Sequence, residues 1–185
     1  LKPHKIPGIV VTITNPADIV ADYVRKGLGL ERNRVFGTGT LLDTARLIRT
    51  LSEESGVGRR SIQAYSLGEH GDSSMIPFSS VTIGGLPFDA YDISKEKVLE
   101  ATRQIGMTII EGKKSTEFGI GRALTEIAAC ILRDEKKIMP ASVLLQGEYG
   151  QHDVHCGVPC LIGKNGIEKI IELPLTEEEQ EMLNK

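Results

Sequence analysis

One short segment of the chain is dense in groups that can transfer protons. In Gly68-Glu69-His70-Gly71-Asp72-Ser73 a single imidazole stands between two glycines, directly after an apolar stretch. Histidine is the side chain best suited to proton transfer near neutral pH, and glycine lets a backbone or a substrate approach closely. The pattern makes His70 a candidate general acid and base. The alternative is a solvated histidine in a surface loop.

A second segment, Asp43-Thr44-Ala45-Arg46, places an acid and a guanidinium three residues apart in a helical pattern, where they project from one face. A surface ion pair is the commoner outcome, but the flanking leucines predict a buried setting in which an unpaired charge is costly. An aspartate bonded to His70 would fix its tautomer and favour its protonated form. Arg46 can hold a carboxylate by two parallel hydrogen bonds. Together the three residues predict binding and reduction of a 2-oxo acid.

Two other patterns contain residue types that could bind a metal or a phosphate. His152, His155, Cys156 and Cys160 are metal-ligand types close in sequence, but strand alternation would split neighbours across two faces, so we predict no metal site. Gly37-x-Gly39-x-x-Leu42 has two of the three glycines of a dinucleotide fingerprint, and no acidic residue follows a second strand at the expected distance. We therefore predict no phosphate-binding loop there.

The elements that must position these residues change in character along the chain. The β-branched run 9–14 predicts a strand buried on both faces, as in a parallel sheet, followed by a helix from Pro16 to Gly27 or Gly29. A short strand over 34–37 then leads into a helix through Leu42 to Leu51. This order is typical of a βαβ unit that feeds a further helix.

The remainder favours an antiparallel sheet interrupted by helices. Apolar runs bounded by Gly and Asn predict five strands, at 62–67, 81–83, 141–146, 154–161 and 169–173. Helical spacing predicts amphipathic helices over 95–112 and 116–133. Thr176-Glu177-Glu178-Glu179 has the pattern of a capping box and predicts a last helix.

Composition excludes several classes of function. The 185 residues hold 22 Lys and Arg against 25 Asp and Glu, a net charge of −3, so no basic surface for nucleic acid is expected. No apolar run approaches the roughly 20 residues of a membrane span. Three cysteines are an odd number for a disulfide framework, which favours a reducing, cytoplasmic setting. The chain opens on Leu1 with neither an initiator Met nor a signal peptide, and we expect it to begin within a longer protein.

Four segments resemble, in order and spacing, the second half of NAD-dependent L-lactate dehydrogenases. They are Thr14–Asp18, Gly37–Arg46, Gly68–Ser73 and Gly157–Pro159. The similarity spans essentially the whole chain and points to bacterial enzymes, but L-2-hydroxyisocaproate and malate dehydrogenases share the same plan. The resemblance implies an α/β fold: the remnant of a doubly wound (Rossmann) parallel sheet in residues 1–37, then an α+β substrate domain with antiparallel sheet in residues 38–185.

The resemblance also implies a role for each matching residue. His70 would be the proton donor and acceptor, Asp43 its orienting carboxylate and Arg46 the anchor of the substrate carboxylate. The remaining implied site residues contact the substrate or the nicotinamide ring of NAD: Asn15 both, Thr116 the substrate, and Ile13, Thr38 and Ile120 the cofactor. The implied ligands are NAD and a 2-oxo or 2-hydroxy acid, without a metal.

The same resemblance implies a homotetramer and leaves the substrate open. The family's glycine-rich turn and substrate-selecting loop would lie upstream of Leu1, so we expect the 185 residues alone not to turn over. A non-catalytic, oligomerising module is the alternative from another class. Many bacterial relatives are activated by fructose 1,6-bisphosphate through a basic residue and a histidine at positions that match Ile48 and Gln63 here. Because neither is a cation, we expect no such activation.

Overall fold

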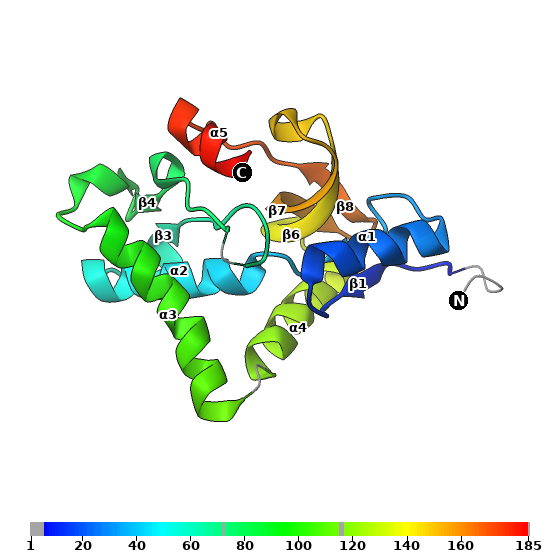
Figure 1. Ribbon diagram of the computed structural model, residues 1–185, viewed down its shortest axis with the longest axis horizontal. Coiled ribbons are helices and arrows are strands. Elements are labelled where there is room, and N and C mark those ends of the chain that lie inside the picture. Colours follow the sequence, from blue (N-terminus) through cyan, green and yellow to red (C-terminus); the bar gives the residue numbers. More distant parts are fainter. Residues whose placement is uncertain (1–5, 72, 115–116, 185) are drawn as a thin grey trace.

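The computed structural model describes residues 6–71, 73–114 and 117–184 (Figure 1). They form a five-stranded sheet of order β1-β2-β6-β7-β8 and a small three-stranded sheet of order β3-β4-β5. The predicted mixed α/β fold with an antiparallel sheet is therefore confirmed.

A parallel pair of strands with a helix between them opens the described chain. These elements are β1 (Val10–Thr12), α1 (Ala17–Leu28) and β2 (Val35–Gly37). Helix α1 ends at Gly29, which adopts the left-handed conformation with φ 64° that glycine tolerates best. The prediction that β1 is buried on both faces was wrong. It lies at the edge of the sheet, with β2 as its neighbour, and its side chains are half-buried.

Three long antiparallel strands complete the main sheet: β6 (Lys137–Gln146), β7 (His152–Gly163) and β8 (Gly166–Ile170). Antiparallel pairing of Gly37 with Ser142 joins them to β2. The last strand had been predicted at 169–173 from its β-branched residues. It begins earlier because a tight turn at Lys164-Asn165 lets pairing start at once between Gly163 and Gly166.

The small sheet contains β3 (Ile62–Gln63), β4 (Thr82–Ile83) and β5 (Leu86–Pro87). The predicted strand 62–67 is too long, because after Gln63 the backbone finds other partners. The N–H of Ser66 donates to Thr44 Oγ1 at 2.9 Å, and Thr40 Oγ1 donates to the Ser66 carbonyl at 2.6 Å. These bonds attach the segment to the start of the preceding helix, Leu41–Ser55, instead of to a sheet.

Four helices surround the two sheets: α2 (Leu41–Ser55), α3 (Lys95–Lys113), α4 (Phe118–Arg133) and α5 (Glu177–Leu183). In Figure 1, α3 and α4 diverge as the two arms of a V. The capping box predicted for α5 is present between Thr176 and Glu179. Short 3-10 turns occur at Arg59–Ser61, Phe78–Ser80, Phe88–Ala90 and Glu148–Gly150.

Two apolar cores hold these elements together. The larger core lies between the main sheet and α4 and includes Phe36, Ile127 and Val158. The smaller core packs α2 against α3 and the small sheet through Leu47, Leu51 and Val98. Because α2 also contributes Leu41 to the larger core, this helix is fixed at both ends. It is therefore a rigid support for any side chains on its remaining face.

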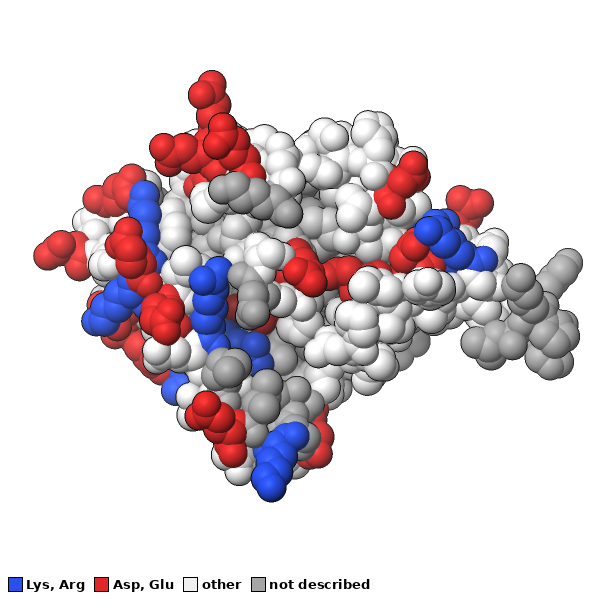
Figure 2. All heavy atoms as spheres, viewed as in Figure 1, with Lys and Arg blue, Asp and Glu red and all other residues white. Residues whose placement is uncertain are grey.

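The surface agrees with the charge balance of the sequence. Figure 2 shows basic side chains interspersed with acidic ones, and acidic residues gathered over α5. The three cysteines are buried and free of disulfides. Among the described residues no helix combines the length and apolar character needed to span a membrane.

Candidate active site

The segment around His70 is held by paired backbone on both sides. Leu67 and Met75 exchange backbone hydrogen bonds of 2.8 and 2.9 Å, which closes the intervening residues into a loop. Gly68 and Gly157 exchange two more, of 3.0 and 2.9 Å. Gly68 has φ 97°, where a side chain would be strained. A Cβ on Gly157 would lie 2.7 Å from Thr40 Oγ1 and 2.9 Å from the Gly68 carbonyl, so this close approach needs glycine.

The structure brings together the three residues that the sequence singled out. His70 Nδ1 lies 2.6 Å from Asp43 Oδ2, and Arg46 Nη1 lies 3.0 Å from Asp43 Oδ1. The side chains of Asp43 and Arg46 are 16% and 15% exposed, and that of His70 is 24% exposed. Asp43 therefore bonds to a guanidinium and an imidazole while partly shielded from water, which strengthens both interactions.

The surroundings of His70 favour its protonated form. The hydrogen bond to Asp43 is the main cause that raises the pKa of His70 above its ordinary value. Burial and the guanidinium of Arg46 act in the opposite direction, while the charges of Asp43 and Asp18 add to the increase. Because Nδ1 faces Asp43, Nε2 is the ring nitrogen left to exchange a proton with a substrate.

A cavity of about 250 Å³ opens beside this triad. Its wall contains Asn15, the triad residues, and a stretch of α3 from Leu99 to Gly106 that includes Arg103. Gly106 allows α3 to approach Arg46, since a Cβ there would lie 3.1 Å from Arg46 Nη1. Two guanidinium groups in one wall suit an anionic ligand of modest size.

The other predicted site residues are more scattered. Asn15 is exposed and lines the cavity, and Ile13 follows β1 with 41% of its surface exposed. Thr38 is buried, and Ile120 is half-buried on the face of α4 that packs against the larger core. Thr116 lies outside the described residues.

Two contacts at the site were not foreseen from the sequence. Asp18 accepts a hydrogen bond from the backbone N–H of His70 at 3.0 Å, and Gly157 pairs with Gly68 at the base of the loop. Both residues belong to the four segments that carried the family resemblance. Their place in these segments is the signal that the sequence offers, but only the folded chain shows which backbone each residue contacts.

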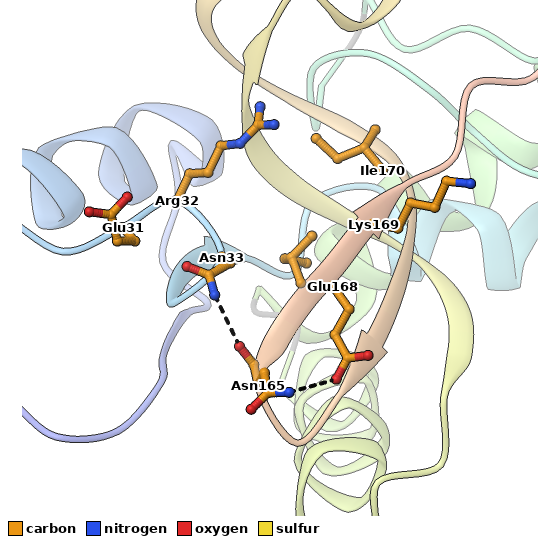
Figure 3. Close-up of a pocket in the computed structure, with 8 residues that line it drawn as sticks. Glu31, Arg32, Asn33, Asn165, Glu168, Lys169 and Ile170 are labelled. Atoms are coloured by element: carbon orange, nitrogen blue, oxygen red, sulfur yellow. Dashed lines mark hydrogen bonds between the residues drawn. The ribbon is translucent and has the colours of Figure 1, made fainter.

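A larger cavity, of about 520 Å³, lies away from the triad and is shown in Figure 3. Several of its polar side chains are paired: Asn33 donates to the Asn165 carbonyl, and Asn165 donates to Glu168 at 3.2 Å. Arg32, another lining residue, forms two hydrogen bonds with Glu148. The wall of this cavity contains none of the candidate site residues predicted from the sequence.

The cysteine and histidine pattern on β7 forms no cluster. Within residues 6–71, 73–114 and 117–184, no group of three or more His, Cys, Asp or Glu side chains is placed to hold a metal ion. His155 is buried near Asp22 of α1, 3.5 Å from it, and Cys160 lies in the larger core. Burial raises the pKa of the Cys156 thiol to about 12, which opposes the thiolate that a metal requires.

Comparison with known proteins places this chain in one family. Residues 40–185 match the alpha/beta C-terminal domain of lactate/malate dehydrogenases. An L-lactate dehydrogenase of Fusobacterium nucleatum is 47% identical over 182 residues, covering 94% of this chain and 57% of that protein.

Solved structures give the same result. The ligand-bound minor L-lactate dehydrogenase of Enterococcus mundtii matches with a TM-score of 0.93 and 36% identity, over 97% of this chain and 60% of that one. The malate dehydrogenase of Aeropyrum pernix matches with a TM-score of 0.89 and 39% identity, over 95% of this chain and 60% of that one. The chain thus spans about three-fifths of the length of these relatives.

The chain is an α/β domain that places a histidine, an aspartate and an arginine around one cavity, and it is of the same class as the C-terminal domains of these dehydrogenases. Within that class, the chain belongs to the lactate/malate dehydrogenase family.

Proposed function

We propose that the protein containing this chain is an L-2-hydroxy-acid dehydrogenase that interconverts pyruvate and L-lactate with NADH and NAD. The observation that carries the proposal is the contact of Asp43 with both His70 and Arg46 at the wall of a cavity. The relatives named L-lactate dehydrogenase favour lactate over malate as the product. We further propose a cytoplasmic homotetramer that acts in fermentation and glycolysis.

The described residues fit the nicotinamide end of a dinucleotide. Strands β1 and β2 are parallel, and ligands of parallel α/β sheets bind beyond the carboxyl ends of the strands. Ile13 presents an apolar surface directly after β1, and Asn15, two residues further on, lines the cavity of His70. These two residues would hold the ring, and we assign Thr38 and Ile120 to its further surroundings. The phosphates would require a glycine-rich turn that the sequence does not contain.

The chemistry divides between cofactor and protein. A bound nicotinamide supplies or accepts the hydride at the second carbon of the substrate. Arg46 binds the substrate carboxylate by two hydrogen bonds, which orients the oxo group toward Nε2 of His70. In reduction the protonated His70 gives its proton to the oxo oxygen, and in oxidation the neutral imidazole takes it back. Asp43 stabilises the imidazolium and keeps the ring oriented.

The test uses the full-length protein that contains this chain, assayed by NADH oxidation with pyruvate, oxaloacetate and 4-methyl-2-oxopentanoate. We expect pyruvate to be preferred, and His70→Asn to lower kcat by about 100-fold or more, because general acid catalysis is lost. The matched control is His152→Asn, an exposed histidine on β7. We also expect the 185 residues alone to be inactive. Equal loss in both variants, or undiminished turnover by His70→Asn, would contradict the assignment.

A further inference from the structure

His155 lies where helix α1 packs on the main sheet. It belongs to β7, with Leu144 of β6 as its cross-strand neighbour, and its side chain is 2% exposed. Neither ring nitrogen has a hydrogen-bond partner among the described residues. Burying a polar group without a partner is costly, and burying a charge without one costs far more. The closed contact between α1 and β7 therefore opposes protonation of this ring.

The carboxylate that faces the ring is already engaged with two cations. Asp22 of α1 lies 3.5 Å from Nδ1 of His155. It also contacts Nζ of Lys26 at 2.6 Å and Nη2 of Arg25 at 3.5 Å, both within the next turn of the helix. Burial is the main cause that lowers the pKa of His155 to about 4. The charge of Asp22 raises that pKa, and the charges of Arg25 and Lys26 lower it.

The other elements around His155 supply no substitute partner for a protonated ring. The loop that carries His70 contributes Glu69, which lines a cavity of about 300 Å³ together with His155 and Cys156. Glu69 is exposed, and its carboxylate accepts a hydrogen bond from a serine of the same loop. Burial raises the pKa of the Cys156 thiol to about 12, so this neighbour stays neutral. Leu144, across the strand pair, carries no charge.

The second half of α1 is lightly held on the sheet. The buried residues of the helix, Ala17 and Ala21, lie in its first half, and every residue from 22 to 28 is half-buried or exposed. The helix then ends at Gly29 in the left-handed conformation. Segments with few buried contacts open locally at a lower free energy than the whole chain. Residues 22–28 are therefore the segment that yields first to a charge placed beneath them.

We propose that the contact between His155 and α1 is an acid-sensitive switch, in which protonation of the imidazole separates the second half of α1 from β7. The opening gives the imidazolium access to water and so removes the cost of a buried, unpaired charge. The switch goes beyond the proposed function, because it needs neither cofactor nor substrate. Since α1 begins two residues after Asn15, which lines the cavity of His70, the same opening would loosen one wall of the candidate active site.

The experiment is amide hydrogen exchange, read by mass spectrometry, on the full-length protein at pH 7.5 and pH 5, with correction for the intrinsic exchange rate at each pH. The pKa of His155 is about 4 in the closed form and takes the ordinary value of about 6.5 in the open form, so acid can increase opening by up to about 30-fold. We expect residues 22–28 to lose protection by about tenfold or more. At pH 5 they should also exchange about tenfold or more faster than residues 123–130 of α4, which pack in the larger core and report opening of the whole chain.

Substitutions identify the ring that is responsible. His155→Phe keeps a ring and binds no proton, so the protection of residues 22–28 should agree at the two pH values within about twofold. His155→Leu serves if the phenylalanine variant does not fold. His152→Phe, at an exposed position of the same strand, should respond as the wild type does.

Three results would overturn the switch. Residues 22–28 of the wild type could keep their protection at pH 5, they could exchange no faster than residues 123–130, or the response could persist without His155. The measurement needs no turnover, so a failure of the proposed dehydrogenase function would be recognised separately.

Discussion

His70 and Asp43 meet at 2.6 Å, although they lie on different elements and 27 positions apart in the sequence. Asp43 projects from the first turn of α2, and His70 projects from the loop that begins just after Ser66. Ser66 is bonded to the hydroxyls of Thr40, the N-cap residue of α2, and of Thr44 in its first turn. The same helix therefore supplies the carboxylate and holds the segment that carries the imidazole. The pKa of His70 therefore differs between the folded and the unfolded chain.

The first prediction concerns stability against pH. The pKa of His70 is raised in the folded chain, so the folded state binds its proton more tightly than the unfolded state. Its stabilisation is fully present below the ordinary value of about 6.5 and is lost as pH rises through the higher folded value. Urea unfolding from pH 6 to 9 should show the free-energy difference between wild type and His70→Asn shrinking with pH. A free-energy difference that grows with pH would contradict the prediction. His152→Asn, which replaces an exposed histidine, is the control.

A second prediction concerns the approach of α3 to Arg46. A Cβ on Gly106 would lie 3.1 Å from Arg46 Nη1, whereas one on Gly112, in the same helix, would have no neighbour within 4 Å. Gly112→Ala should stabilise the helix by about 1 kcal/mol, measured by thermal unfolding, because alanine favours a helix over glycine. Gly106→Ala should instead raise the KM for pyruvate of the full-length protein by about threefold or more, because the guanidinium of Arg46 must shift. An unchanged KM in Gly106→Ala would show that Arg46 adapts freely.

The sequence predicted that three residues meet, and the structure brings them together, whereas several strand bounds differ from those predicted. Asp43 and Arg46 stood out because a charged group among apolar neighbours requires a partner, and His70 because its imidazole stands between two glycines after an apolar stretch. The end of β3 could not be predicted, because Ser66 bonds to Thr40 and Thr44, and these side-chain hydroxyls leave no trace in the local periodicity. Asp18 lies within one of the segments that carry the family resemblance, yet its contact to His70 spans 52 positions and depends on how the chain folds. Long-range contacts of this kind, between a side chain and a distant backbone, cannot be predicted from a single sequence.

A third prediction concerns acid stability. Both ring nitrogens of His155 are buried without a hydrogen-bond partner among the described residues, and the side chain is 2% exposed. Burial lowers the pKa of His155 to about 4, so the unfolded state binds its proton first as pH falls below about 6.5. Stability is thereby lost toward pH 4, by about 2 kcal/mol at pH 5.

His155→Phe should remove most of this loss, because phenylalanine keeps the ring and has no proton to bind. The measurement is urea unfolding at pH 5 and 7.5, with exposed His152→Phe as control. The free energy of unfolding should differ less between pH 5 and pH 7.5 in His155→Phe than in wild type. His152→Phe should show the same difference as wild type. If it stays as in wild type, His155 is not the group responsible.

The last prediction concerns regulation by fructose 1,6-bisphosphate, which activates many bacterial lactate dehydrogenases at a subunit interface. Ile48 and Gln63 hold the positions of the two cations that the phosphate would need, and Ile48 packs against the smaller core. Arg49, the next residue, is engaged with Glu53 at 2.8 Å on the exposed side of α2. An effector shifts an equilibrium only by its differential affinity for two states, and a phosphate has little affinity for either state of a site that lacks cations.

We expect the sugar bisphosphate to leave the apparent KM for pyruvate of the full-length protein unchanged within about twofold. A fall of about fivefold or more, the lower end of allosteric coupling, would show that another cation has taken over. Gln63→His serves as the comparison, because it restores one of the missing cations and should raise the response above that of wild type.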